Sequence, residues 1–566
     1  MNRPPGGSAR PPQLSRPVPD RSQLQVKMRQ QFGSLANSLG GGSLGAQQQD
    51  DRPFVDERAL LQDNYLKPTL RIIIGVFLAS LFAYVASGPA FDAPGVWANS
   101  FRFDTALVVL WGPLLFWVMR RWKIRGAVRI YLVLALFIEP FSETMLKQQG
   151  DGYWDTYLWP AAVAYYGTIK EWSGMPGASL PVFFLVTIGL LYRAVWGRKD
   201  DTYVAPPKFA RTIYFVFMGG VLGLSVWGLI HGGTLEAEVR QILHLFQLPL
   251  IGLLFLYTLR VPEDLPAIGT IFVATALVRS ALVIYIYFGV FVPEGITQRP
   301  GHPEWCTTHS DSVLFVISIL IVVMHAFEQR TRRTIWRAVF ISAFILFAMV
   351  LNNRRLAFVS LAIAPAAIYA ALKPSKRKFQ VTLGLVLTIP VVVGYVLIGS
   401  EINSPSPILK PAKLVMSVLE QRDTSSQSRD IENENLIYTL RQNAFIPTGF
   451  GSEYQYSPDN PPVDLTDVFV NYRLIAHNGV LWLWSLGGVI GFTILWLIFP
   501  ITGTLALRGY RNAGSALERS AALVSFGSVA VCIVQIWGDQ GANGYMTPVT
   551  IGVSYAIATR LAMRAA

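Results

Sequence analysis

Residues 312–372 read SVLFVISILIVVMHAFEQRTRRTIWRAVFISAFILFAMVLNNRRLAFVSLAIAPAAIYAAL, and this stretch decides the fold class. It holds three apolar runs, near 312–327, 336–351 and 356–372, divided by short turns that carry arginines. Each run approaches the roughly 20 residues with which a helix crosses the hydrocarbon core of a bilayer. The stretch therefore predicts transmembrane helices joined by tight turns.

Eleven more runs of this kind flank the stretch and bring the predicted number of spans to fourteen. They lie near 72–88, 104–119, 128–145, 179–196, 212–230, 241–259, 266–292, 380–399, 479–500, 520–537 and 546–563. The whole 566-residue chain is 52% hydrophobic and 15% charged, whereas soluble domains carry about 25% charged residues. We expect an all-α, polytopic transmembrane helical bundle, and this composition excludes a soluble enzyme.

The net charge of +13 is arranged as short basic clusters between the apolar runs. With the N-terminus in the cytoplasm, all of these clusters fall on the cytoplasmic side, as the positive-inside rule requires. The arrangement predicts that both termini are cytoplasmic, and it argues against a nucleic-acid partner. Cys306 and Cys532 are isolated, so we expect no disulfide framework and no zinc site. The clusters lie at 120–129, 198–211, 330–337, 373–378 and 508–519.

Four segments follow from this reading. Residues 1–68 are rich in Pro, Gly, Ser and Gln and are predicted to be a disordered cytoplasmic segment, because they lack apolar residues. Residues 69–400 form the first part of the transmembrane bundle. Residues 401–476 are dominated by polar and acidic side chains and form one large extracytoplasmic (periplasmic) loop. Residues 477–566 hold the C-terminal transmembrane spans.

Arginines that lie within a span or on the predicted outer face depart from this distribution of charge, and they are the first candidates for a functional site. Arg354 and Arg355 share a tight turn on the predicted outer face, where they either reach lipid phosphates or bind an anion through the guanidinium fork. Arg279 lies near the middle of a span, where a cation costs about 2.5–3.5 kcal/mol. It must therefore face a partner, for which Glu139 is one choice, or a wet cavity, and both interpretations stay open.

The long loop and its exit supply further candidates. His477 stands where the loop enters the span at 479–500, and it is either an interfacial polar residue or a general base. Arg429 and Arg441 lie in the loop on a stretch that predicts an amphipathic helix. Surface arginine is the simpler interpretation for both of them.

Three segments, taken in this order, resemble the O-antigen ligase and polymerase superfamily of bacterial envelope glycan assembly. They are LNNRRLAF at 351–358, SRDIENENLIYTLRQNAFIPTGFGSEY at 428–454 and AHNGVLWLWSLGGVIGF at 476–492. Two positions depart from the family pattern, since Arg354 replaces a small polar residue and Leu356 replaces a glycine. The predicted spans also exceed the number common in the family.

The resemblance implies an enzyme of the bacterial inner (cytoplasmic) membrane. It would transfer a glycan from a polyprenyl diphosphate carrier to an acceptor hydroxyl on the outer face, in the assembly of a surface polysaccharide. Arg355 and Arg429 would then clamp the diphosphate, with Arg354 and Arg441 in support. His477 would take the acceptor's proton, and Asp539 would orient the acceptor. The scheme needs no metal and no cofactor.

The alternatives lie within and outside this family. We favour a polymerase over a ligase, because no acceptor-binding domain is visible in the sequence. A transporter or flippase of a lipid-linked oligosaccharide also fits fourteen spans and an intramembrane Arg279, but the internal repeats expected of such a protein are not visible. Besides the donor and membrane lipids, other polysaccharide assembly proteins are expected partners through residues 1–68.

Overall fold

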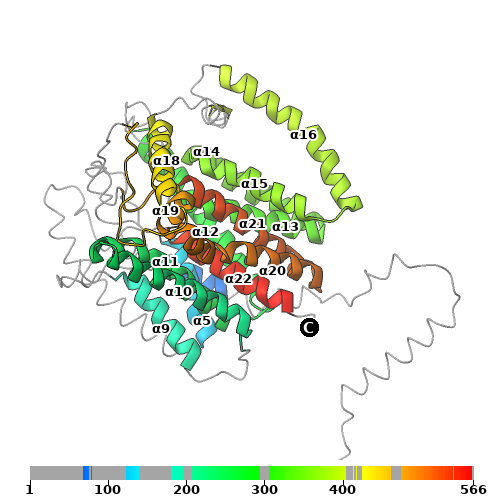
Figure 1. The fold of residues 1–566 in the computed structure, drawn as a ribbon. Helices are drawn as coiled ribbons and strands as arrows, with labels where there is room; N and C mark the ends of the chain where they lie inside the picture. Colours follow the sequence, from blue (N-terminus) through cyan, green and yellow to red (C-terminus); the bar gives the residue numbers. More distant parts are fainter. Residues whose placement is uncertain are drawn as a thin grey trace, which may run out of the picture. The chain divides into compact units, whose positions relative to one another are not determined.

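Helices make up all the regular structure of the part of the chain that the computed structural model describes (Figure 1). This part consists of residues 68–75, 78, 123–138, 180–196, 205–293, 305–402, 409, 412–413, 416, 424–460, 473–539, 541–542 and 544–563. All of them belong to one compact unit, Val55–Ala566. The predicted N-terminal segment 1–68, apart from Pro68, and the predicted span 104–119 lie outside these residues.

Beside shorter helical stretches such as residues 68–75, the all-α class is confirmed within these ranges by fourteen α-helices and one short π-helix. They are α5 (Ile124–Phe137), α9 (Val182–Trp196), α10 (Lys208–Ile230), α11 (Leu235–Thr258), α12 (Leu265–Tyr285), η2 (Ile286–Phe291), α13 (His309–Gln329), α14 (Arg332–Asn352), α15 (Arg355–Ala371), α16 (Lys376–Glu401), α18 (Thr424–Asn443), α19 (Gly479–Trp496), α20 (Ile498–Asn512), α21 (Ala516–Gly538) and α22 (Met546–Met563).

Seven helical segments among the described residues are long and apolar enough to cross a membrane. Each coincides with a predicted span, so the chain is a multi-pass membrane protein. Two further apolar helices, α9 and α15, are shorter, and the total of fourteen spans stays a prediction. The seven are Lys208–Ile230, Leu235–Thr258, Leu265–Gly289, His309–Gln329, Arg332–Asn352, Gly479–Asn512 and Ala516–Gly538.

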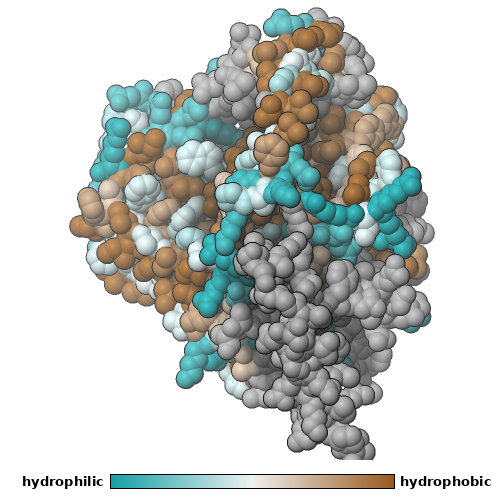
Figure 2. All heavy atoms as spheres, turned by 90° about the vertical axis from the view of Figure 1, so that its right-hand side faces the viewer, coloured by the Kyte–Doolittle hydropathy of each residue, from teal (hydrophilic) through white to brown (hydrophobic). Residues whose placement is uncertain are grey.

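Large apolar side chains on the surface agree with a lipid environment. The face drawn in Figure 2 carries broad hydrophobic areas beside hydrophilic ones. On α14, for example, Trp336, Phe340, Phe344 and Phe347 are all exposed. A contiguous apolar surface of this kind is rare on soluble monomers but is what lipid tails contact.

Helix α21 lies at the centre of the packing, where it contacts α13, α15, α20 and α22 (Figure 1). A small residue allows two of these contacts: a Cβ placed on Gly527 would lie 2.9 Å from Ile368 Cδ1 on α15 and 3.0 Å from Leu320 Cδ1 on α13. Close approach at small residues is how helices associate in membranes, where no water drives them together.

The helices bring two different sets of ends together. One set, the site end, consists of the start of α13 at His309, the turn between α14 and α15, and the end of α21 at Gly538. The opposite set, the basic end, holds Arg330, the first turn of α14 and the start of α21. There Arg519 of α21 pairs with Glu328 of α13 at 2.7 Å. The site end and the basic end are separated by the length of these helices.

Candidate functional site

The turn between α14 and α15 places both arginines of the NNRR sequence at the site end. Asn353 takes a left-handed conformation with φ 54°, and its N–H donates to the carbonyl of Met349 at 3.2 Å. Asparagine adopts this conformation more easily than most residues, so α14 ends here. Arg354 then precedes α15, and Arg355 is its first residue and half-buried.

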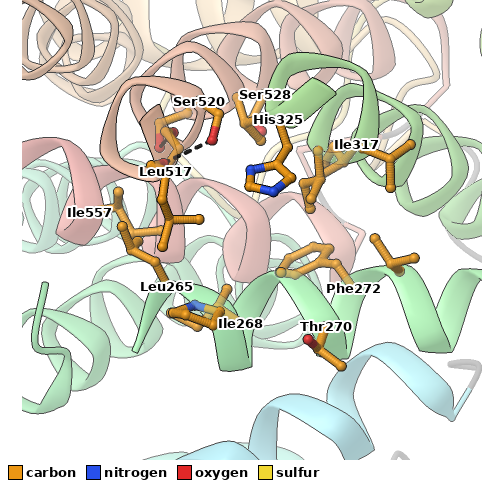
Figure 3. Close-up of a pocket in the computed structure, with 18 of the residues that line it drawn as sticks. Leu265, Ile268, Thr270, Phe272, Ile317, His325, Leu517, Ser520, Ser528 and Ile557 are labelled. Atoms are coloured by element: carbon orange, nitrogen blue, oxygen red, sulfur yellow. Dashed lines mark hydrogen bonds between the residues drawn. The ribbon is translucent and has the colours of Figure 1, made fainter. Parts of the chain in front are cut away.

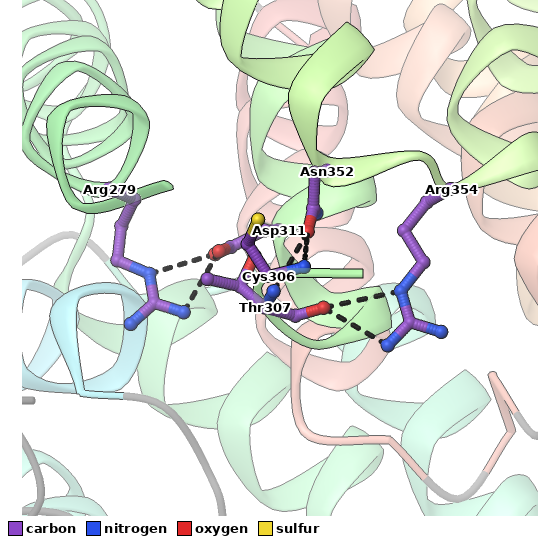
Figure 4. A network of polar contacts seen from close by, with 6 residues as sticks. All are labelled: Arg279, Cys306, Thr307, Asp311, Asn352 and Arg354. Carbon is purple, nitrogen blue, oxygen red and sulfur yellow. Dashed lines mark hydrogen bonds and ion pairs between the residues drawn. The ribbon is translucent and has the colours of Figure 1, made fainter. Parts of the chain in front are cut away.

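Arg354 is held by the segment that leads into α13. Its Nε and Nη2 donate to the carbonyl oxygen of Thr307 at 3.2 and 3.0 Å (Figure 4). Its guanidinium carbon lies 4.2 Å from the centroid of the Trp305 ring, a cation–π contact. Because the side chain is buried and engaged on two sides, it does not extend to lipid phosphates.

This segment and the first turn of α13 are fixed from two other helices (Figure 4). The side-chain oxygen of Asn352 accepts the N–H groups of Cys306 and Thr307 at 3.0 and 2.8 Å. On the other side, Arg279 of α12 donates through Nε and Nη2 to the two carboxylate oxygens of Asp311, each at 2.9 Å. Both side chains of this pair are 2% exposed. Arg279 is thus neutralised by a carboxylate on α13, while Glu139, the partner considered from sequence, lies outside the described residues.

His309, at the start of α13, joins Arg354 to Asp539. Its Nε2 lies 2.9 Å from Arg354 Nη1, and its Nδ1 contacts Oδ2 of Asp539. A guanidinium has only donors, so Nε2 accepts and Nδ1 carries the proton toward the carboxylate. Burial by itself would raise the pKa of Asp539, but His309, Arg429 and Arg354 around the carboxylate lower this pKa below its ordinary value. Asp539 is therefore an anion beside two guanidinium groups and the ring N–H of His309.

Arg429 reaches the same place from α18. Its Nη1 donates to the carbonyl oxygen of Gly538 at 3.0 Å, directly beside Asp539. Gly538 also lies against Leu356 in the first turn of α15, because a Cβ at this glycine would lie 2.4 Å from Leu356 Cδ2. The end of α21 thus brings the turn holding Arg354 and the helix holding Arg429 together.

His477 is held by Glu432 of the same helix α18. Oε2 of Glu432 accepts the backbone N–H of His477 at 3.1 Å and lies 3.1 Å from Nδ1 of its ring. Glu432 follows Arg429 by three residues, so their side chains are neighbours on one face of α18. The glutamate is 5% exposed and the histidine 24%. One helix face therefore carries a guanidinium and the carboxylate that orients an imidazole.

The backbone around His477 is fixed as well. Asn478 caps α19 by accepting the N–H of Leu481 at 3.1 Å, and its amide donates to Asn433 of α18 at 3.0 Å. Gly479 packs against α21, since a Cβ there would lie 2.9 Å from Cγ2 of Ile536. His477 thus lies between α18 and the last turn of α21.

The glycines of the TGFG sequence at 448–451 serve close packing. The N–H of Phe450 donates to the carbonyl of Leu224 on α10 at 3.2 Å. Gly449 has φ 81°, and a Cβ there would lie 2.4 Å from the Cα of Gly228. The segment after α18 is therefore fixed to α10 through backbone contacts.

The structure brings together some of the residues expected from sequence and separates others. Arg354, Arg429, His477 and Asp539 meet at the site end, with Arg355 beside them in the turn. Arg441 is exposed and follows Arg429 by twelve residues on α18, which corresponds to about 18 Å along the helix axis. Arg441 is therefore not part of this group.

Sequence reasoning missed two members of the site. His309 belongs to the sequence CTTHSD directly before a span, and Glu432 follows Arg429 by one helical turn. Both positions carried a signal, namely a polar cluster at a span end and a carboxylate on the same predicted helix face. Within the described ranges, no three His, Cys, Asp or Glu side chains are grouped so as to hold a metal ion.

This arrangement has two chemical capacities. Guanidinium groups beside one another bind phosphate oxygens strongly and with defined geometry. An imidazole whose Nδ1 is directed at a carboxylate presents Nε2 as a proton acceptor. Both capacities are found at the same end of the bundle.

A comparison with protein families matches part of the chain. The family model described as O-antigen ligase matches residues 340–496. The matched range includes the α14–α15 turn, all of α18 and His477 with α19. No curated protein matches the chain.

Proposed function

From the membership of residues 340–496 in the O-antigen ligase and polymerase superfamily, we propose that the site end transfers a glycan from a polyprenyl diphosphate carrier to an acceptor hydroxyl. The chain is thus a membrane enzyme of surface polysaccharide assembly. The carrier, the acceptor and the roles of the residues below belong to the proposal.

One observation carries the proposal: a series of contacts, linked where residues are close neighbours in the chain or on α18, joins Arg354 to His477. It runs from Arg354 through His309 to Asp539, and from the neighbouring Gly538 to Arg429. One turn along α18, Glu432 then holds His477. Residues more than 120 positions apart in the chain (354 and 477) are thus joined at one end of the bundle.

The arginines would bind the diphosphate. Arg429 uses Nη1 for the carbonyl of Gly538, and the rest of its guanidinium fork is proposed to contact phosphate oxygens together with Arg355. Arg354 is engaged by Thr307 and His309, so its role is to fix the turn that presents Arg355. The positive groups would stabilise the charge that develops on the leaving diphosphate.

His477 would act as the general base. The acceptor oxygen forms a bond to the anomeric carbon while the bond from that carbon to the phosphate oxygen breaks, and the bonding electrons leave with the diphosphate. The hydroxyl proton moves to Nε2 of His477, and Glu432 stabilises the resulting imidazolium through Nδ1. Asp539 is proposed to orient the acceptor. No metal ion takes part in this scheme.

The membrane orientation follows from the charges. Because Arg330 and the first turn of α14 lie at the basic end, this end is proposed to face the cytoplasm. The site end would then face the outer side of a bacterial inner membrane, where lipid-linked glycans are joined. Both termini would be cytoplasmic, and residues 1–68 would be available to other assembly proteins.

The transporter alternative gains no support from Arg279. A cation within a span is energetically costly and often lines the pathway of a transported substrate, so Arg279 was consistent with a transporter. Its buried pair with Asp311 supplies another explanation. We favour a glycan polymerase over a ligase for the reason given above.

The proposal is tested by deletion and complementation. Removing the chain should shorten or abolish one surface polysaccharide, seen as a collapsed ladder on a gel, and a polymerase is expected to leave single repeats. Complementation with wild type should restore the ladder, whereas His477→Ala should fail. His231→Ala, which changes an exposed histidine at the end of α10, is the matched control. A normal ladder from His477→Ala at normal membrane expression would refute the proposed mechanism.

A further inference from the structure

A cavity of about 390 Å³ lies toward the basic end, away from the site just described. Helices α12, α13, α14, α21 and α22 surround it (Figure 3). His325, which lines it, follows His309 by sixteen residues on α13, or about 24 Å along the helix axis. The hydrocarbon core of a bilayer is about 30 Å thick, so the cavity and the site belong to opposite leaflets.

The cavity has the character of a ligand site. Its lining is mainly apolar, with Phe272, Ile317 and Ile557 among the side chains around the space (Figure 3). Its volume falls in the range of about 300–1,000 Å³ that is usual for small-molecule pockets. An apolar chain would fill it with favourable contacts.

Two polar atoms in the lining lack partners among the described residues. They are Nδ1 of His325, whose ring points into the cavity in Figure 3, and Oγ1 of Thr550. Thr550 is 1% exposed, so water at the surface does not satisfy its hydroxyl. Buried polar groups are nearly always hydrogen-bonded, so these two atoms are available to a ligand or a trapped water in the cavity.

A cation lies at the edge of the same cavity. Arg337 of α14 lines it and is exposed at the same time. On the outward face of this helix, the rings of Trp336 and Phe340 stack with centroids 5.7 Å apart, and both are exposed. Aromatic residues with a nearby arginine are typical of the depth at which lipid headgroups begin.

We propose that this cavity binds one acyl chain of an anionic phospholipid whose phosphate is bound by Arg337. The positive charge of Arg337 favours the lipid phosphate, and the apolar lining favours the acyl chain. The lipid comes from the leaflet at the basic end, so it is a different molecule from a donor lipid with its diphosphate at the site end. The inference rests on the membrane location of the chain and does not need the proposed reaction.

Photo-crosslinking of the full-length chain tests this site. The protein is placed in phosphatidylcholine vesicles containing phosphatidylglycerol with a diazirine near the end of one acyl chain, and labelled residues are found by mass spectrometry. We expect labels within 265–277, 317–325 and 517–528. Arg337→Gln should reduce this labelling about fivefold, because the direct charge-assisted hydrogen bonds from the guanidinium to the phosphate are lost. The matched control is Arg333→Gln, which removes the same charge from the same helix but does not line the cavity.

A second variant tests whether the cavity binds the acyl chain of the lipid. Ala274→Phe adds a ring to a partly exposed lining position and should remove the labels while the unfolding temperature in detergent is kept. Unlabelled phosphatidylglycerol should compete with the probe, and phosphatidylcholine should not. The proposal is overturned if the Arg337→Gln and Arg333→Gln variants are labelled to the same extent, or if Ala274→Phe is still labelled like wild type. Equal competition by phosphatidylglycerol and phosphatidylcholine would also overturn it.

Discussion

Glu432 holds His477 at two points, because one carboxylate oxygen accepts the backbone N–H at 3.1 Å and lies 3.1 Å from Nδ1 of the ring. Two contacts from one side chain define both the position of the histidine backbone and the rotation of its ring. A base oriented in this way presents Nε2 in one direction only. The geometry predicts that the glutamate matters for glycan transfer as well as for folding.

Glu432→Gln should therefore lower the rate of glycan transfer. The amide can still accept a hydrogen bond, but it no longer stabilises the imidazolium that forms when His477 takes a proton. General base catalysis contributes about 10²–10⁴-fold, so the loss should lie between tenfold and that limit. The measurement is the rate of ladder formation in membranes. Glu434→Gln, an exposed position two residues along the same helix, should behave as wild type. Equal rates in the two variants would remove Glu432 from the mechanism.

Arg429 and Arg441 offer a matched pair of arginines on α18. Arg429→Ala should abolish or strongly reduce laddering, because it removes a proposed phosphate ligand and the link to Gly538. Arg429→Lys should restore only part of the activity, since an ammonium cannot form the two-point contact of a guanidinium. Arg441→Ala should be close to wild type, because this exposed residue lies about 18 Å along the helix. The opposite order of effects would place the donor elsewhere.

The buried pair of Arg279 and Asp311 should dominate the stability of the site end. Asp311→Asn leaves a guanidinium without its counter-charge among buried residues, and such a change costs about 3–5 kcal/mol. The thermal unfolding temperature in detergent should fall accordingly. The double variant Arg279→Met with Asp311→Leu should recover most of the loss, because no uncompensated charge remains. If the double variant is as unstable as the single one, the pair has a role beyond charge balance.

The lowered pKa of Asp539 predicts a pH effect on stability. The carboxylate is stabilised in the folded protein by His309, Arg429 and Arg354, so the unfolded chain takes up its proton first. This stabilisation is fully present above the ordinary carboxyl pKa of about 3.9, and it is lost as the pH falls through the lower folded value. Unfolding temperatures measured from pH 6 downward should therefore fall more steeply below about pH 5 for wild type than for Asp539→Asn. Asp459→Asn, at an exposed position, should follow wild type.

Much of the fold could be predicted from the sequence, because each membrane helix is encoded by its own apolar run. The predicted spans at 312–327 and 336–351 became α13 and α14, with ends that differ by a few residues. The turn with Arg354 and the exit with His477 were also recognised, since each is a short local pattern.

The partners in the site could not be predicted in the same way. Glu432 and His477 are 45 positions apart and Arg279 and Asp311 are 32 apart, so no local pattern joins them. From the sequence, Glu139 was considered as a partner for Arg279, and Asp311 was not; tertiary packing pairs this arginine with Asp311. Arg441 shows the converse, because helix geometry alone separates it from Arg429 by more than three turns.

Helix α21 is one continuous element of 23 residues, with Ser520 against the cavity near its first turn and Asp539 immediately after its last residue. An α-helix resists compression along its axis because every turn is hydrogen-bonded to the next. A displacement of α21 along that axis consequently moves both ends by equal amounts. The lining of the cavity and the carboxylate beside Arg429 therefore belong to one continuous helical rod, with no loop of α21 between them.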